Sequence, residues 1–403
     1  MRPFDGRRIL LGVTGGIASY KSAMLARLLA QSGAEVDVVM TRAAQEFVGS
    51  ITFEAVTGRK TFSEIFGAGN ALDHIRLARE AAILVVAPAT ADFLARSAHG
   101  HADDLLTACL LANTAPVLLV PAMNDRMWAN AQTARNVAHL RQLGYSVLDP
   151  DDGPLAAGEG AGPGRMPEPE AIMAAMARIL EPRGGLYGRN IVVTAGATRE
   201  PVDPVRFISN HSSGRMGVAL ADAAHRRGAD VTLVAGHLDV TPGSWLRVLR
   251  TATTANMLAA VEELLPASDV LIMAAAPADF RPVRPAAHKI KKSSSSLPAA
   301  IELTQTEDII KSTAGARRAG SVIVGFALET ENELANGAQK LREKRLDLVV
   351  VNSAIEHGAG FVTDTNRVTL LAPGEADVHV PMMKKTELAD VILDRVESIL
   401  NGR

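Results

Sequence analysis

Short apolar runs alternate with longer stretches of helical spacing along this chain, and the alternation predicts an α/β fold. The predicted strands of the first half fall near residues 8–13, 35–40, 83–87, 117–121 and 145–148. The predicted helices of this half fall near 18–31, 91–97, 103–111, 134–143 and 168–180. Strands that alternate with helices in this way form β-α-β units.

The second half repeats the organisation of the first. Its predicted strands fall near 190–194, 230–234, 269–275, 322–327 and 348–351, and its helices near 216–227, 255–265, 332–345 and 385–400. Residues 6–16 and 188–196 each form an apolar run that leads into a Gly-containing loop. Because both halves start alike, we expect each to be its own α/β domain.

Segments rich in Gly and Pro mark the predicted linker and loops. Residues 181–188 are the expected linker, so the predicted domains are 1–187 and 188–403. Residues 149–166 are expected to be a lid, a binding loop or a disordered segment. Residues 281–296 carry several lysines and four consecutive serines, which predicts a mobile basic loop.

Composition limits the classes of function. The 403 residues include 42 Lys and Arg against 44 Asp and Glu, which gives a net charge of −2 and no general attraction to nucleic acid or anionic membranes. Cys109 is the single cysteine, so the chain forms no intrachain disulfide and no thiolate metal cluster. Its apolar surroundings predict an inert core thiol. The apolar runs are too short to span a bilayer, and we expect a cytoplasmic protein that binds small molecules.

Residues 121–128, with the sequence PAMNDRMW, follow a predicted buried strand. Ligands bind beyond the carboxyl ends of parallel strands, so Asn124 could hold a polar group there while Met123 packs against a flat ring. The alternative is that Asn124 only caps the next helix.

Three further features of the first half have both a functional and a structural interpretation. The loop 14–19 could hold a phosphate on free N–H groups, with Thr41 and Arg42 at the next strand end, or it could be a turn without a ligand. Thr90 or Asp92, in 87–92, could cap a helix. His74 is either a general acid or base or a structural histidine.

Two segments of the second half could bind anions. Residues 209–217 place hydroxyls, amides, Arg215 and glycines before a helix, and form either an anion site or an elaborate N-cap. Residues 288–292 include three lysines that could clamp polyphosphate or could be a solvated charge run.

Together these motifs closely resemble the bacterial bifunctional phosphopantothenoylcysteine decarboxylase / phosphopantothenate–cysteine ligase family of coenzyme A biosynthesis. The resemblance runs from Ile9 to the final helix. It is carried by TGGIA at 14–18, His74, APATAD at 87–92, PAMNxxMW at 121–128, GPGRM at 162–166, TREP at 198–201, ISNHSSGxMG at 208–217, KIKK at 289–292, GFxxET at 325–330, Lys340, Lys344 and FVTDTNR at 361–367.

The resemblance implies two Rossmann-like three-layer domains: an N-terminal flavodoxin-like FMN domain and a C-terminal nucleotide-binding ligase domain. In the family, FMN oxidises the cysteinyl thiol of 4′-phosphopantothenoylcysteine toward a thioaldehyde, CO₂ leaves, and the enethiolate is reduced and protonated to 4′-phosphopantetheine. His74 matches the catalytic histidine, and Asn124 the residue that grips the substrate carboxylate. The positions that would surround FMN are Gly15, Gly16, Ile17, Thr41, Ala87, Ala89, Thr90 and Met123.

For the second half, the resemblance implies that 4′-phosphopantothenate reacts with CTP and Mg²⁺ to an acyl-cytidylate, from which L-cysteine displaces CMP. Arg206 and Asn210 match positions that handle the acyl-cytidylate, and Lys289 matches a phosphate-binding lysine. The CTP positions are Ala275, Asp279, Lys289, Glu307, Asp308, Ile309, Ile310, Phe326, Lys340 and Lys344. The CTP phosphates would hold most of the Mg²⁺ coordination. The family's ligase dimers and flavin-domain trimers build a homododecamer.

Three positions depart from the family pattern. Pro277 and Glu307 lie in segments assigned to the nucleotide pocket. Ala157 stands where the family has the cysteine that protonates the enethiolate, so we expect the reductive step to be impaired.

Three other functions would fit parts of the pattern. The flavin half could be only an oligomer scaffold beside an active ligase, or it could be an oxidative cysteine decarboxylase. A nucleotide-binding regulatory protein would explain neither Asn124 nor residues 208–217.

Overall fold

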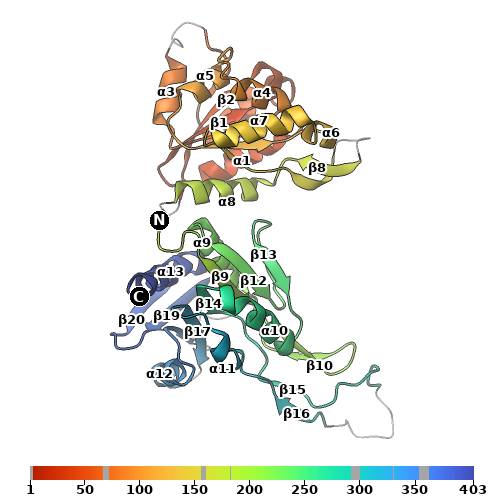
Figure 1. Ribbon diagram of the computed structural model, residues 1–403, viewed down its shortest axis with the longest axis vertical. Helices are drawn as coiled ribbons and strands as arrows, with labels where there is room; N and C mark the ends of the chain where they lie inside the picture. The colour runs from red at the N-terminus through yellow and green to blue at the C-terminus, as the bar shows by residue number, and fades with distance from the viewer. Residues whose placement is uncertain are drawn as a thin grey trace. The chain divides into compact units, whose positions relative to one another are not determined.

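The computed structural model describes residues 3–66, 72–155, 160–181, 183–291, 300–329, 331–353 and 363–403. The chain forms two compact units, Met1–Pro182 and Arg183–Arg403. Each unit is an α/β domain built around one large sheet (Figure 1). Within the described residues, no helix is long and apolar enough to cross a membrane.

The sheet of the first unit is parallel throughout. Its strands are β1 (Arg8–Val13), β2 (Glu35–Met40), β3 (Thr61–Phe62), β4 (Ile83–Ala89), β5 (Val117–Pro121) and β6 (Ser146–Val147), in the order β3-β2-β1-β4-β5-β6. Without the two-residue edge strand β3, the order is that of a flavodoxin-like domain, 2-1-3-4-5. The expected Rossmann-like, flavodoxin-like architecture is therefore confirmed.

Helices cover both faces of this sheet. They are α1 (Ser19–Gln31), η1 (Arg42–Glu46), α2 (Ser50–Thr57), α3 (Asp73–Glu80), α4 (Ala91–Ala98), α5 (Leu105–Ala112), α6 (Asp125–Trp128), α7 (Ala131–Gln142) and α8 (Pro169–Leu180). Ile9 and Leu11 of β1 pack with α1, α2 and α8, whereas Leu10 packs with α3, α4, α5 and α7. Successive strand residues point to opposite faces, so one apolar run supplies both cores.

The sequence pattern missed α2 and α3. Phe53 is the single fully enclosed residue of α2, and α3 buries only Leu77 and Ala78, so neither helix shows a long apolar stripe. His74 therefore lies on a helix that the pattern did not predict.

The segment 149–166 is more ordered than expected. Its described parts pair as an antiparallel hairpin of β7 (Asp151–Pro154) and β8 (Ala161–Arg165), so these parts are not the disordered segment that was one of the three expected alternatives. Ala157 lies outside the described residues.

The second unit is built on an eight-stranded sheet. Its strands are β9 (Asn190–Ala195), β12 (Asp230–Ala235), β13 (Arg247–Arg250), β14 (Val270–Met273), β17 (Val322–Glu329), β18 (Leu348–Ser353), β19 (Thr365–Leu371) and β20 (Val378–Lys384), in the order β13-β12-β9-β14-β17-β18-β19-β20. The strands from β13 to β18 are parallel, and β19 and β20 add antiparallel strands at one edge.

The sequence pattern missed β13, β19 and β20. Arg247, Arg250 and Val378 are exposed, so these strands lack the continuous apolar run of a central parallel strand. An edge strand with one solvated face is harder to distinguish from a loop by composition.

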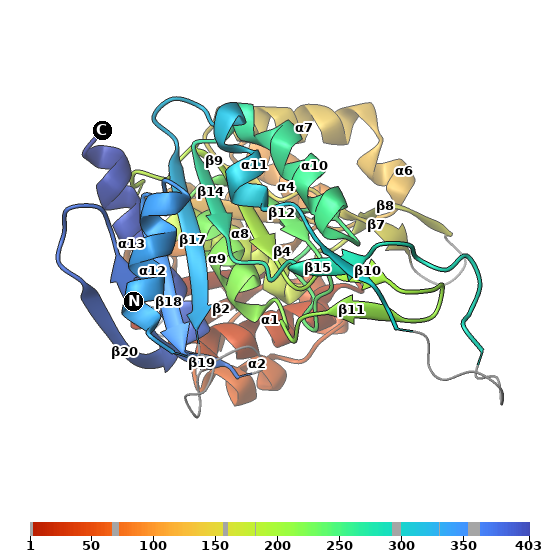
Figure 2. The same ribbon diagram turned by 90° about the horizontal axis from the view of Figure 1, so that it is seen from below.

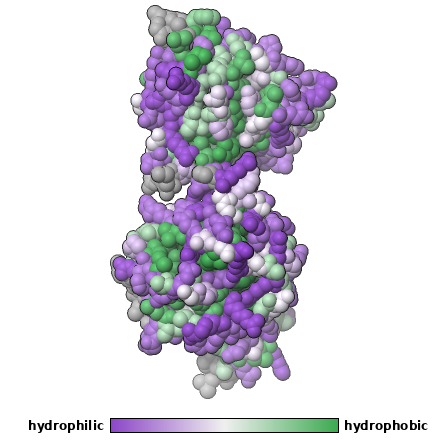
Figure 3. Space-filling view, turned by 60° about the vertical axis from the view of Figure 1, so that its left-hand side comes forward, coloured by the Kyte–Doolittle hydropathy of each residue, from purple (hydrophilic) through white to green (hydrophobic). Residues whose placement is uncertain are grey.

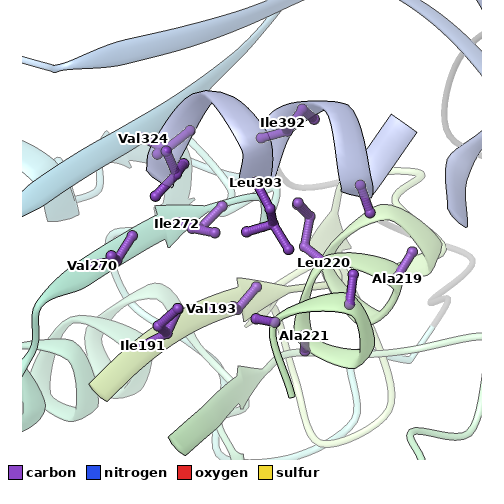
Figure 4. Close-up of a cluster of buried hydrophobic side chains, with 14 of the residues drawn as sticks. Ile191, Val193, Ala219, Leu220, Ala221, Val270, Ile272, Val324, Ile392 and Leu393 are labelled. Atoms are coloured by element: carbon purple, nitrogen blue, oxygen red, sulfur yellow. The ribbon is translucent and has the colours of Figure 1, made fainter. Parts of the chain in front are cut away.

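Figures 1 and 2 show the helices of the second unit on both faces of its sheet. They are α9 (Arg215–Arg226), α10 (Thr254–Leu264), η2 (Leu265–Ala267), α11 (Ile309–Ser312), η3 (Ala314–Ala316), α12 (Glu333–Glu343) and α13 (Lys385–Asn401). In one core, Val193 of β9 packs with Leu220 of α9 and Leu393 of α13 (Figure 4). The other core packs α10, α11 and α12 on the opposite face.

Two short hairpins extend from this unit. They are β10 (Arg199–Pro201) with β11 (Phe207–Ser209), and β15 (Phe280–Pro282) with β16 (Leu303–Gln305). Residues 281–282 thus belong to a strand rather than to the predicted mobile loop. Residues 292–296 of that loop lie outside the described residues.

Candidate functional site

The first unit has a pocket of about 420 Å³ beyond the carboxyl ends of β1, β4 and β5. This is the switch point between β1 and β4, where ligands of open α/β sheets bind. The residues that line the pocket are Gly15, Gly16, Ile17, Ala18, Tyr20, Lys21, Pro88, Thr90, Ala91, Ala122, Met123, Asn124, Met127, Pro154, Leu155, Gly164, Arg165 and Met166.

We call this cavity the flavin-side pocket, after the cofactor that the resemblance implies. Thr14 joins the loop after β1 to the loop after β4 beside it. Its buried hydroxyl donates to the Pro88 carbonyl at 2.7 Å and accepts from the Thr90 N–H at 3.1 Å. The Ser19 hydroxyl donates to the Thr14 carbonyl at 3.0 Å. A Cβ on Gly15 would lie 2.4 Å from the Ala43 Cβ, so only glycine fits there.

Helix α1 begins without a side-chain cap. The Ser19 and Lys21 N–H groups at the start of α1 donate to the Gly16 and Ala18 carbonyls, so an anion at this helix end would be bound by the N–H groups of the preceding loop. Since Gly15, Gly16 and Ile17 line the pocket at this helix end, a phosphate fits there.

Asn124 satisfies both interpretations of its sequence position. Its Oδ1 caps α6 by accepting the Arg126 N–H at 2.9 Å, and the same side chain lines the pocket. The Met123 N–H donates to the Gly164 carbonyl at 3.0 Å, which holds the hairpin strand β8 beside Asn124.

Four residues assigned to the flavin site by resemblance do not line this pocket. Thr41 is buried and caps η1, and Ala87 and Ala89 are buried within β4. His74 is half-buried on α3, and its buried Nδ1 has no hydrogen-bond partner in the part of the chain that the structure describes.

Sequence reasoning missed Lys21 in the flavin-side pocket. This lysine is buried, and its Nζ donates to the Met166 carbonyl at 2.8 Å and to Glu168 Oε1 at 3.0 Å. A lysine on the apolar side of an amphipathic helix was the available signal, because lysine is buried only when it is paired.

The second unit has a pocket of about 600 Å³ at its own switch point, between β9 and β14. We call it the nucleotide-side pocket, after the ligand that the resemblance implies. The expected residues that line it are Asn210, Ala275, Asp279, Glu307, Asp308, Ile309, Ile310, Phe326, Lys340 and Lys344. The lining that was not expected includes Asn352, Asn366 and Lys385. Lys289 and Arg206 are absent from its described lining.

Threonine hydroxyls hold the loop after β14 in place. Thr194 Oγ1 accepts the Ala275 N–H at 3.1 Å, and Thr198 Oγ1 accepts the Ala278 N–H at 2.8 Å. The Asn210 amide donates to the Pro277 carbonyl at 3.0 Å. Because the proline contributes only its carbonyl to this contact, Pro277 is compatible with the loop.

Lys340, Lys344 and Asp308 line one side of the nucleotide-side pocket, and their combined charge is positive. We call this group the positive wall. Lys344 Nζ lies 2.8 Å from Asp308 Oδ2. Burial raises the pKa of Asp308, but hydrogen bonds from Lys344 and the Lys311 N–H outweigh it and leave the pKa below its usual value. Lys340 donates to the Phe326 carbonyl at 2.6 Å, and burial followed by the charge of Lys344 lowers its pKa.

The loop 209–217 leads into α9 without capping it by a side chain. Gly214 takes the N-cap position with φ +77, a conformation that favours glycine. Ser212, Ser213 and Gly214 line the pocket, so the elaborate N-cap that we considered is not what this loop forms.

Arg206 and Lys289 lie on the segments beside the nucleotide-side pocket. Arg206 Nη1 donates to Asp203 Oδ2 at 3.0 Å and to the Ile290 carbonyl at 3.1 Å. Lys289 is exposed. Among the described residues, no three His, Cys, Asp or Glu side chains form a candidate metal site.

Both halves of the chain match known families. Residues 2–181 match the flavoprotein family, and residues 186–400 match the C-terminal domain of the DNA/pantothenate metabolism flavoproteins.

Relatives match the whole chain. The coenzyme A biosynthesis bifunctional protein CoaBC of Mycobacterium bovis is 43% identical over 98% of this chain and 97% of its own length. The protein of that name from Vibrio vulnificus is 40% identical over 99% of this chain and 100% of its own length. A crystal structure of the C-terminal domain of a CoaBC protein covers 55% of this chain and 100% of that domain, at 35% identity and a TM-score of 0.46.

Both relatives match nearly the whole chain, so a single family accounts for both units and for the pocket in each. The chain belongs to the family of bifunctional coenzyme A biosynthesis proteins.

Proposed function

We propose that this chain ligates 4′-phosphopantothenate to L-cysteine through an acyl-cytidylate, with CTP and Mg²⁺, and then decarboxylates the product to 4′-phosphopantetheine with FMN. The observation that carries the proposal is the pair of separate pockets, one at the switch point of each unit. Each pocket collects residues that the family motifs assign to one of the two reactions.

FMN fits the first pocket by the chemistry of its lining. The loop before α1 offers N–H groups to a phosphate, and position 15 has room only for glycine. Met123 and Met127 offer apolar contact to a flat ring. The bound flavin would supply the oxidation and reduction of the substrate's cysteinyl carbon and sulfur. Asn124 would orient the substrate carboxylate with the amide nitrogen that its capping bond leaves available.

We further propose that a second copy of the chain brings His74 to this pocket. Phe66, Leu72 and Ile75 beside His74 are exposed by 82%, 71% and 45%, and Figure 3 shows apolar areas on the visible face of this unit. Tyr20 and Ile17 at the pocket are also exposed.

A head-to-tail contact between these two apolar surfaces would be heterologous, and a rotation of 120° between copies would close it into a trimer. The contact would place the unpartnered His74 Nδ1 within an enclosed site. Sedimentation of the flavin unit as a monomer would contradict this arrangement.

In the ligase pocket, Asn210 is held against the loop after β14, where the acyl group of the intermediate would lie. Lys340 and Lys344 would face the nucleotide, and Mg²⁺ would be coordinated mainly by its phosphates. Lys289 would reach the phosphates from its exposed segment. Replacing Lys289 by Gln should therefore slow pyrophosphate release from CTP, and an unchanged rate would remove this lysine from the reaction.

Ala157 bears on the last step of decarboxylation. An alanine methyl has no proton to donate, so the protonation of the enethiolate would need water or another acid. Ala157→Cys should raise the yield of 4′-phosphopantetheine. An undiminished yield from the natural chain, unchanged in the variant, would show that the proton comes from elsewhere.

The deciding experiment is mass analysis of the products from phosphopantothenate, cysteine, CTP and Mg²⁺. Formation of 4′-phosphopantetheine supports both reactions. Accumulation of 4′-phosphopantothenoylcysteine by a flavin-free protein would indicate that only the ligase is active and that the first unit serves as an oligomer scaffold. Accumulation of the enethiol, with the two electrons left on the flavin, would indicate an oxidative decarboxylase.

A further inference from the structure

Two polar side chains in the nucleotide-side pocket have no role in the reactions described so far. They are Asn366 on β19 and Lys385, the first residue of α13. Both belong to the antiparallel edge of the sheet and the final helix, far in sequence from the other residues of the pocket. Their presence shows that the pocket extends to this edge.

Lys385 is a buried cation at the wall of this cavity. It is 5% exposed, and its Nζ donates to the Thr363 carbonyl at 2.7 Å. Burial and the nearby charge of Arg215 lower its pKa to about 8, against the opposing effect of Asp364. The environment therefore disfavours a positive charge, and an anion in the cavity would compensate for it.

Asn366 adds a second donor beside Lys385. It is 3% exposed, and its Oδ1 accepts the Arg367 N–H at 3.1 Å. Because Asn366 lines the pocket, its side-chain amide nitrogen can donate hydrogen bonds to a ligand there. Gly214 and Arg215, at the start of α9, line the same pocket, and the Gly214 N–H donates to the Ser212 hydroxyl.

These donors are distinct from the positive wall described above. Lys340 donates to the Phe326 carbonyl and Lys344 pairs with Asp308. Lys385 instead donates to the Thr363 carbonyl. The cations that line the cavity of about 600 Å³ are therefore held by different segments of the chain.

We propose that Lys385 and Asn366 bind a phosphate group of a ligase substrate, together with the first turn of α9. The inference rests on the proposed ligase function and adds two residues to it. Two substrates carry such a group: the polyphosphate of CTP and the phosphomonoester of 4′-phosphopantothenate.

The first test compares Lys385→Met with Lys384→Met in the full-length protein. Lys384 is the preceding residue and is exposed, so it controls for the loss of one charge near the same helix end. Lys385→Met should raise KM for one phosphate-bearing substrate about ten- to a hundredfold, which is the loss expected for a hydrogen bond to a charged group. Lys385→Arg should restore part of that affinity, and Lys384→Met should change it little.

The substrate whose KM rises identifies the source of the phosphate. A rise for CTP assigns the site to the polyphosphate, and a rise for phosphopantothenate assigns it to the monoester. Equal effects of both methionine variants, or a change confined to the KM of cysteine, would overturn the proposal.

A binding measurement separates this inference from the proposed function. Calorimetric titration of the full-length protein with magnesium pyrophosphate, and separately with inorganic phosphate, should show binding that Lys385→Met weakens. If the natural chain made no acyl-cytidylate, the ligase proposal would fail, while loss of probe binding would still support the anion site. Asn366→Asp, which keeps the size and adds a negative charge, tests the same site if the lysine variant does not fold. Unchanged probe binding in the folded variants would overturn the inference.

Discussion

At the residue scale, neighbouring glycines of the flavin-side pocket have different constraints. A Cβ at position 15 would meet both the side chain and the backbone of Ala43 within 2.9 Å, whereas one at position 16 would meet only Thr90 Cγ2 at 3.9 Å. Gly15 is therefore required by the packing against Ala43, whether or not a ligand is bound. Gly16 has no such contact and faces the open pocket.

We expect Gly15→Ala to destabilise the flavin-stripped protein by about 1–3 kcal/mol, the usual cost of overpacking. Gly16→Ala should leave the melting temperature of the flavin-stripped protein unchanged, and should weaken only the retention of flavin. Thermal melts with and without added FMN measure both effects. Equal melting temperatures of the two stripped variants would refute the distinction.

Cys109 gives a second prediction for a single side chain. The thiol is fully buried, and burial followed by the charges of Asp104 and Asp73 raises its pKa to about 12. At pH 8 it is protonated and enclosed, so iodoacetamide should not alkylate the native protein within hours. The urea-unfolded chain should react fully, as mass analysis can show. Rapid labelling of native protein would mean that α5 opens readily.

At the scale of elements, Asp222 and Trp245 join α9 to the segment before β13. The Trp245 Nε1 donates to Asp222 Oδ1 at 3.0 Å. Burial raises the pKa of Asp222 from 3.8 to about 6, and the tryptophan hydrogen bond only partly opposes it. The folded protein therefore binds this proton more tightly than the unfolded chain, and stability falls as the pH rises from about 4 to 6.

Asp222→Asn keeps the acceptor for Trp245 and removes the buried charge. It should raise the melting temperature at pH 7.5, with a smaller gain at pH 5 and none below about pH 4, where the natural carboxyl is protonated in both states. Melts at these three values of pH measure the trend. A gain that is the same at every pH would show that charge is not the cause.

At the scale of the whole molecule, the two compact units divide the chemistry. His74 belongs to the first unit and Asn210 to the second. His74→Gln should reduce CO₂ release by about 10²–10⁴-fold, the usual contribution of a general acid or base, and leave pyrophosphate release intact. Asn210→Ala should do the reverse. Joint loss of both activities in a folded single variant would contradict this division.

The sequence itself determined the central strands and most helices of both units. The runs that form β1, β4, β9 and β17 are buried on both faces, so they are apolar throughout and visible without a structure. The Gly-containing first turns follow such strands directly, and Asn124 comes three residues after the end of β5. Their placement beyond the carboxyl ends was therefore predictable from order alone.

Only the tertiary structure decided which of these residues meet. Lys385, Asn366 and Lys21 reach their pockets from segments whose local pattern is that of an ordinary helix or strand. The antiparallel strands β19 and β20 have no continuous apolar run, and the pairing of β7 with β8 depends on contacts between residues separated along the chain. A local pattern records how each residue partitions between water and core, but the assembly of a site depends on long-range packing, which no single segment encodes.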